Sequence, residues 1–138
     1  MIEVGMTHQK AWVVADEHLA SRYGSGLVDA LATPVLVGLC EECARMMVEP
    51  HLAQGQKTVG TAIQLDHLAA TPPGLRVIVT AKLVEIDRTR LRFDVEARDE
   101  IEPIARASHE RFIIDTARFE RRIQEKLRNA TSAGEQRT

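Results

Sequence analysis

The sequence lacks the marks of several large functional classes. It has no apolar run near the ~18 residues that a membrane-spanning helix needs, and its net charge of -2 offers no basic face for nucleic acid. It also lacks the motifs G-x-S-x-G, G-x-G-x-x-G and H-E-x-x-H and a Walker loop, so serine-hydrolase, nucleotide-binding and zinc-protease chemistry have no support. The first residues lack a basic and then apolar signal-peptide layout. We therefore expect a cytoplasmic protein that binds neither nucleic acid nor membrane.

Cysteine is scarce, and the two that occur are Cys40 and Cys43. A C-x-x-C pair can serve redox chemistry or half of a zinc site. This pair falls two to three turns into an apolar helical run, whereas a redox pair opens a helix so that the helix start lowers the thiol pKa. We interpret both as small buried hydrophobic residues and expect no metal and no cofactor, with a redox or metal role as the alternative.

The length and composition that are present suit one globular domain. The chain has 138 residues, 44% of them hydrophobic and 28% charged. We assign residues 1–128 to this domain and residues 129–138, which are polar and small, to a flexible tail.

One long helix is expected near the middle of the domain, at about residues 34–49. Thr33 is placed as its N-cap and Pro34 as its first helical residue, and Pro50 ends it. Apolar residues cover most of its faces, so it must be buried on most sides. Glu41 is the exception, because it is a carboxylate on an apolar side.

Strand patterns surround this helix. Alternation of apolar and polar residues predicts strands at residues 9–15, 57–67, 75–86, 91–98 and 104–115. In the strand at 57–67 the alternation places Val59, Thr61, Ile63 and Leu65 on one face. Residues 16–32 look irregular or briefly helical and could form a lid, and residues from 116 onward form a charged amphipathic helix. These elements predict an α+β domain in which an antiparallel sheet is wrapped around the central helix.

Three residues are candidates for chemistry. An uncompensated buried carboxylate is costly, so Glu41 is either paired in an interface salt bridge or part of a wet site. His67 ends a strand just before T-P-P-G, a common position for site residues, although it could simply be an exposed histidine. Thr33 lies eight residues before Glu41, or about 12 Å along a helix, so the two cannot bond directly. His109 and Glu110 are interpreted as ordinary sheet residues.

Two segments carry a resemblance to a known family. T-P-V-L-V-G-L-C-E, followed by V-G-T-A-I-Q-L-D-H-L-A-A-T-P-P-G, resembles the fluoroacetyl-CoA thioesterases of the hot-dog fold, as does S-H-E-R-F-I-I near the end. The resemblance implies that Thr33, Glu41 and His67 form a catalytic set and that Gly60 lies beside the acyl group. Val37 and Thr61 are expected to join Gly60 in binding substrate. Residues 16–32 lack the phenylalanines of that family's lid.

The resemblance implies a hot-dog acyl-CoA thioesterase that releases a free acid and CoA. It would act as a homodimer, or a dimer of such dimers, with sites at the subunit interface. A short acyl chain is expected. The alternatives are a non-catalytic hot-dog module that binds an acyl thioester or small apolar ligand, and a hot-dog dehydratase.

Overall fold

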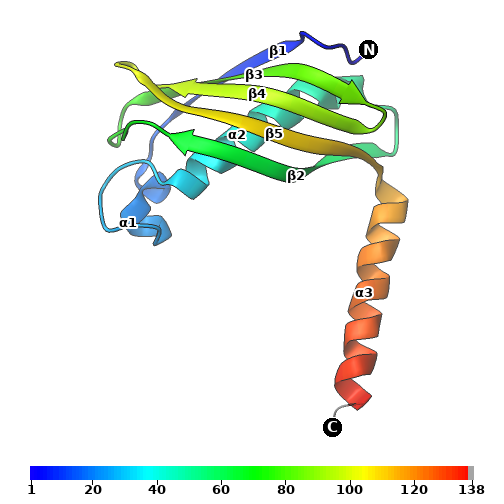
Figure 1. The fold of residues 1–138 in the computed structure, drawn as a ribbon. Helices are drawn as coiled ribbons and strands as arrows, with labels where there is room; N and C mark the ends of the chain where they lie inside the picture. Colours follow the sequence, from blue (N-terminus) through cyan, green and yellow to red (C-terminus); the bar gives the residue numbers. More distant parts are fainter. Residues whose placement is uncertain (137–138) are drawn as a thin grey trace.

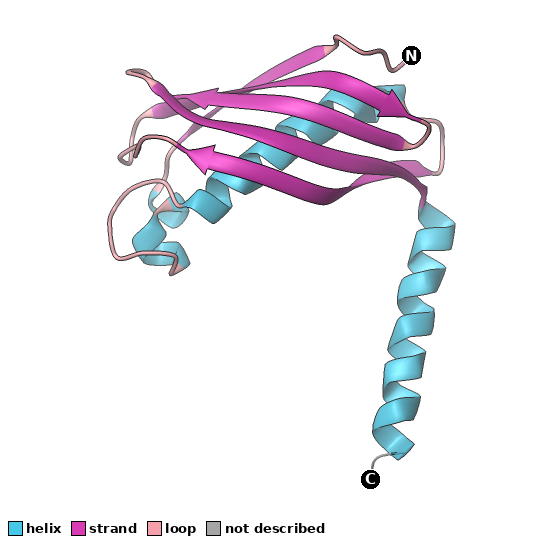
Figure 2. Ribbon diagram, in the orientation of Figure 1, coloured by secondary structure: helices cyan, strands magenta, loops and turns pink. Residues whose placement is uncertain are grey.

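One antiparallel sheet lies against a long helix in the computed structural model, which describes residues 1–136 (Figure 1). The α+β class and the central helix predicted from the sequence are both confirmed. The strands are β1 (Thr7–Val13), β2 (Gln56–His67), β3 (Arg76–Asp87), β4 (Arg90–Arg98) and β5 (Pro103–Asp115). The helices are α1 (Ala20–Tyr23), α2 (Thr33–Val48) and α3 (Thr116–Gln136), with short 3-10 turns at Asp16–His18 and Glu49–His51 (Figure 2).

The strand order in the sheet is β1-β3-β4-β5-β2, and all neighbouring pairs are antiparallel. Strands β3, β4 and β5 form an antiparallel meander. Strand β2 does not pair with β3, the strand that follows it, but lies beside β5 at the edge of the sheet. This edge is 12 residues long, and one side of its backbone has no strand partner within residues 1–136.

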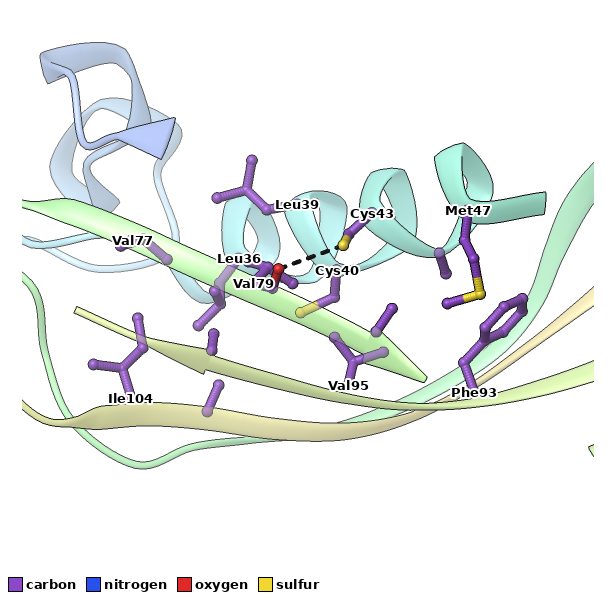
Figure 3. Close-up of a cluster of buried hydrophobic side chains, with 14 of the residues drawn as sticks. Leu36, Leu39, Cys40, Cys43, Met47, Val77, Val79, Phe93, Val95 and Ile104 are labelled. Carbon is purple, nitrogen blue, oxygen red and sulfur yellow. Dashed lines mark hydrogen bonds between the residues drawn. The ribbon is translucent and has the colours of Figure 1, made fainter. Parts of the chain in front are cut away.

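The core lies between helix α2 and the inner faces of strands β3 and β4 (Figure 3). The alternating apolar residues of β3 and β4, from which the sequence predicts these strands, are all buried: Val77, Val79, Ala81, Leu83, Leu91, Phe93, Val95 and Ala97. From α2, Leu36 and Val48 are fully buried against them. Burial of one such side chain contributes about 1.5–3 kcal/mol, so this contact fixes α2 on the sheet.

Helix α2 is covered on one side only within the single chain. Val35, Val37 and Met46 are half-buried, and Gly38 is exposed. The expectation that the sheet buries α2 on most sides is therefore wrong for the single chain, because a five-stranded sheet reaches only the helix face that rests on it. The uncovered side of α2 carries Glu41, Glu42, Arg45 and Glu49 beside its half-buried apolar residues, and Glu41 reaches the free edge strand β2 at Gly60.

A β-bulge at Thr61 divides strand β2 into two segments. Gly60 pairs with Arg111 and Ala62 pairs with Glu110, so Thr61 is an extra residue on the β2 side. The bulge changes which residues face the helix, because side chains alternate along a strand. Val59 pairs with Phe112 and Ile63 pairs with His109.

Because Phe112 and His109 are three positions apart on β5, Val59 and Ile63 face opposite sides of the sheet. The predicted common face of Val59 and Ile63 is therefore wrong.

Helix α3 leaves the end of β5 and projects away from the sheet (Figure 1). It continues to Gln136, so residues 129–136 are helical where the sequence predicts a flexible tail, and only residues 137–138 of that tail lie outside the described part. No helix within residues 1–136 is both long and apolar enough to cross a membrane.

Candidate active site

A threonine and a histidine meet where helix α2 begins and strand β2 ends. The Thr33 hydroxyl oxygen lies 2.8 Å from Nδ1 of His67. The sequence predicts Thr33 as the N-cap of α2, and this is wrong: Ala32 is the N-cap residue and no side chain caps the helix. The Thr33 side chain is instead turned toward the histidine, so its hydroxyl serves the site and not the helix end.

The imidazole of His67 is set up as a neutral group with one free nitrogen. Burial lowers the pKa of His67 below its ordinary value. Its Nε2 atom is buried and has no hydrogen-bond partner among the described residues. A neutral imidazole has one donor and one acceptor nitrogen. If the Thr33 hydroxyl donates to Nδ1, the proton of the ring sits on Nε2, which can then donate to a bound molecule.

Glu41 lies on α2 two turns after Thr33. Its side chain is 41% exposed, which corrects the prediction of a buried carboxylate: the single chain leaves this side of α2 open. The carboxylate reaches the inner face of β2 at Gly60. A Cβ atom built on Gly60 would lie 2.5 Å from Oε2 of Glu41, so only glycine leaves room for the carboxylate in this position.

An arginine that sequence reasoning missed holds the other side of this carboxylate. The side chain of Arg111 is 6% exposed, and its Nη1 lies 3.9 Å from Oε2 of Glu41. The guanidinium donates to the hydroxyl of Thr58 at 2.9 Å and to the Thr58 carbonyl at 3.1 Å. Burial lowers the pKa of Arg111, and the Glu41 carboxylate opposes this shift.

His109 completes the buried group and corrects its interpretation as an ordinary sheet residue. Its Nδ1 donates to the carbonyl of Ala62 at 2.8 Å, and its Nε2 accepts from Nη1 of Arg111 at 3.3 Å. Burial is the main reason that the pKa of His109 is lowered, so the ring is neutral at pH 7.

A sequence signal for this pair exists. His109 and Arg111 share one face of β5 with the small apolar residues Ala105 and Ala107, and this face turns toward the helix.

The polar residues therefore form two groups within one chain. Thr33 and His67 lie at the start of α2, and Glu41, Gly60, His109 and Arg111 lie beside its middle. Eight helical residues separate Thr33 from Glu41, which is about 12 Å. Of the three predicted catalytic residues, the structure brings Thr33 and His67 together. Glu41 belongs to the second group.

Comparison with known proteins places these groups in a family. Residues 14–117 match the family of fluoroacetyl-CoA-specific thioesterases. The chain belongs to this thioesterase family. One member is the fluoroacetyl-CoA thioesterase of Streptantibioticus cattleyicolor, which is 41% identical over 99 residues, or 71% of this chain and 70% of that protein.

Solved structures agree with this assignment. A solved structure of the fluoroacetyl-CoA thioesterase matches with a TM-score of 0.86 at 32% identity, over 91% of this chain and 98% of that one. A thioesterase superfamily member from Thermus thermophilus gives 0.85 at 28% identity and covers 94% and 98%.

A hot-dog-like protein from Thermanaerovibrio acidaminovorans gives 0.84 at 21% identity, covering 91% and 93%. The expected hot-dog fold is confirmed.

In this member of the thioesterase family, a cleft of about 410 Å³ opens beside the first polar group. Thr33 and His67 line it together with Val28 and Leu31 from the segment before α2 and Leu68 from the loop after β2. The irregular or briefly helical segment expected at residues 16–32 is confirmed, and it forms one wall of this cleft.

The remaining candidate residues lie outside the two polar groups. Val37 lies one turn before Glu41 on α2 and is half-buried. Thr61 is the exposed bulge residue, and its hydroxyl donates to the carbonyl of Glu110 at 3.3 Å. Cys40 and Cys43 are buried in the core, where burial raises the pKa of Cys40 to about 12. A thiol with so high a pKa has almost no reactive thiolate at pH 7.

Proposed function

We propose that this protein hydrolyses acyl-CoA thioesters to a free acid and CoA, as the names of its relatives indicate for them. The single observation that carries the proposal is the hydrogen bond between Thr33 and His67, which leaves Nε2 of a neutral imidazole free beside a cleft. Fluoroacetyl-CoA thioesterase structures with fluoroacetate and CoA bound support CoA thioesters as the substrate class. The free, buried cysteines fit a reducing compartment, and we place the enzyme in the cytoplasm.

The working unit is a homodimer joined through strand β2. The 12 residues of this strand form an open edge, and the unpaired backbone groups of such an edge readily pair with a strand of another chain. Glu41, which lies on the uncovered side of α2, reaches the same edge at Gly60. Two dimers joining into a tetramer would use surfaces other than this edge.

This pairing would bring the two polar groups together. An antiparallel pairing of β2 with its copy, centred on the strand, sets the end of one strand beside the start of the other. His67 ends β2, and Thr58 and Gly60 lie near its start. The Thr33–His67 pair of one subunit would then face Glu41 of the partner subunit, and each dimer would hold two equivalent sites.

The chemistry follows from the charges of these groups. Nε2 of His67 donates a hydrogen bond to the thioester carbonyl oxygen and stabilises the negative charge that develops there. The Glu41 carboxylate takes a proton from water as the water oxygen bonds to the carbonyl carbon. The carbon–sulfur bond then breaks, the electron pair goes to the CoA sulfur, and the Glu41 carboxyl returns its proton to that thiolate.

Attack by the Glu41 carboxylate itself would give an acyl-enzyme anhydride. An acid quench of a single turnover, followed by mass spectrometry of the Glu41 peptide, distinguishes the two routes. An acyl group on that peptide would identify Glu41 as the nucleophile, and an unmodified peptide supports the role of base.

Gly60, Val37 and Thr61 are proposed to contact the acyl or pantetheine part of the substrate. Gly60 does so from beside the Glu41 carboxylate. We propose a short acyl group, since a variant of the fluoroacetyl-CoA thioesterase has been solved with acetyl-CoA bound. Residues 16–32 contain no phenylalanine, so we do not extend selectivity for fluoroacetyl groups from the relatives to this chain.

The test measures hydrolysis of a panel of short acyl-CoA esters, with release of the free CoA thiol as the signal. Glu41→Gln and His67→Gln should each lower kcat by at least about 100-fold, in the range of lost acid–base catalysis. Glu42→Gln is the matched control, because Glu42 is adjacent on α2 but pairs with Lys10 at 3.5 Å. Binding of CoA esters without turnover would establish the non-catalytic alternative, and water addition to an enoyl-CoA would establish a dehydratase.

A further inference from the structure

Helix α3 carries an apolar stripe that no other part of residues 1–136 covers. Phe119, Ile123 and Leu127 recur every four residues on one face, and all three are exposed. The helix has 21 residues, or about 31 Å of length. It contacts the rest of the chain mainly where it leaves β5. Isolated helices are marginal in water and gain stability from a partner surface, so the stripe points to a docking partner.

The direction of α3 identifies where that partner lies. The helix starts beside Gln56, at the first residue of β2, because Gln56 pairs with Asp115. From there it projects beyond the β2 edge of the sheet (Figure 1). A second copy joined through β2 occupies the space beyond that edge. The helix therefore runs toward the second copy and away from its own sheet.

Symmetry decides which end of the second copy α3 meets. Within one chain, α3 leaves from the start of β2, and residues 16–32 lie at the opposite end of that strand (Figure 1). Residues from this segment line the cleft together with His67, the last residue of β2. Antiparallel pairing of two β2 strands sets unlike ends beside each other. Helix α3 of one subunit thus lies at the cleft end of its partner.

That end of the molecule presents apolar side chains to solvent. Leu27 is 97% exposed, and Tyr23, Val28 and Leu68 are also exposed. Clusters of exposed large apolar residues mark interaction sites on soluble proteins. The charges agree as well: residues 116–136 hold five Arg or Lys and three Glu, whereas residues 1–115 hold 12 Arg or Lys and 17 Asp or Glu. A basic helix is thus complementary to the acidic body of a second copy.

We propose that the α3 stripe of each subunit binds the partner's lid, meaning residues 16–32 with Leu68. This contact fixes the lid over the cleft that holds Thr33 and His67, so each subunit controls access to its partner's acyl site. The inference rests on the dimer of the proposed function.

Photo-cross-linking tests the contact directly. Benzoylphenylalanine replaces Ile123 in the full chain, and this variant is mixed with ¹⁵N-labelled wild-type protein before irradiation. We expect cross-links between subunits to peptides that contain residues 16–32 or Leu68. Cross-links confined to the same chain, cross-links to other surfaces of the partner, or no cross-link would each overturn the proposal.

A matched pair of variants tests its consequence. Phe119→Ser/Ile123→Ser/Leu127→Ser removes the stripe, and Gln124→Ser/Glu125→Ser/Arg128→Ser changes another face of the same helix without altering net charge. The dissociation constant of the dimer, from sedimentation, should rise at least tenfold in the first variant and less than twofold in the second. Equal values in both would overturn the proposal.

Two further measurements separate this inference from the proposed function. Thioester hydrolysis that depends on Glu41, in a dimer that gives no lid cross-link, would reject the α3 contact alone. A wild-type protein that sediments as a monomer would reject both the α3 contact and the composite site.

Discussion

The substitution Gly60→Ala tests directly the position of the Glu41 carboxylate beside strand β2. The backbone of Gly60 does not have a positive φ, so alanine fits the strand conformation. The new methyl group, however, would lie 2.5 Å from Oε2 of Glu41. It would also lie 3.3 Å from Nη1 of Arg111 and from Cε1 of His109, which allows little movement of the methyl group itself.

The size of the effect follows from this distance. Close contacts of a Cβ atom begin at 3.0–3.4 Å, so the carboxylate must move by about 0.5–0.9 Å from 2.5 Å. Misplacement of a catalytic group by about 1 Å can cost a factor of roughly 100. We expect kcat to fall by about 10- to 100-fold, which is a barrier increase of about 1.4–2.7 kcal/mol.

Folding should be nearly unaffected by the same change. The Glu41 side chain is 41% exposed and can turn toward water. The free energy of unfolding should therefore change by less than about 1 kcal/mol, as is usual for surface sites. Gly134→Ala in helix α3 is the matched glycine control, since a Cβ there meets nothing within 4 Å.

Steady-state hydrolysis and urea unfolding of four proteins check the reasoning: wild type, Gly60→Ala, Glu41→Gln and the double variant. If the alanine acts through the carboxylate, it should cost less than about threefold in the Glu41→Gln background, because interacting sites are not additive. Two results would refute the position that we assign to the Glu41 carboxylate. One is a kcat of the double variant that falls 10- to 100-fold below that of Glu41→Gln, and the other is a kcat of Gly60→Ala within twofold of wild type.

Three further predictions concern the other groups. Thr33→Val should lower kcat by about 10-fold or more and cost about 1 kcal/mol of stability through the lost hydrogen bond. Thr33→Ser should keep the wild-type kcat and stability. Equal kinetics in the two variants would contradict this role of the hydroxyl. Burial lowers the pKa values of His67 and His109, so below about pH 6.5 the unfolded chain binds more protons than the folded one. The free energy of unfolding, measured in urea, should be highest above that pH and fall as the pH drops through the lowered pKa values. A free energy of unfolding that stays constant between pH 7.5 and 5 would count against neutral buried rings. Cys40→Ala/Cys43→Ala should keep kcat within twofold while losing about 1–3 kcal/mol of stability, and loss of turnover in the folded double variant would revive a thiol role.

The sequence predicts the elements well where side-chain alternation decides them. The inner faces of β3 and β4 follow a strict period of two, and their apolar residues, such as Val77, Val79 and Phe93, are buried as expected. The start of α2 is also placed within one residue by Pro34. These features depend on neighbours in the chain, which a single sequence contains.

Other features depend on contacts that the sequence does not display. The Thr33 hydroxyl has two possible partners, the helix start and a ring 34 positions later, and only the fold decides for the ring. His109 and Arg111 look like ordinary strand residues until β5 is seen to turn them toward Glu41. The resemblance to the thioesterase family links Thr33, Glu41 and His67, but it gives no geometry for them.

The bulge at Thr61 is the feature that makes the candidate site possible. Gly60 and His67 are seven positions apart, and in a regular strand an odd separation puts two side chains on opposite faces. One extra residue between them reverses the alternation. The same strand can then place Gly60 beside Glu41 and also turn His67 toward Thr33. Because both lie on the face toward α2, antiparallel pairing of this strand with its copy would unite the two polar groups in each of two sites.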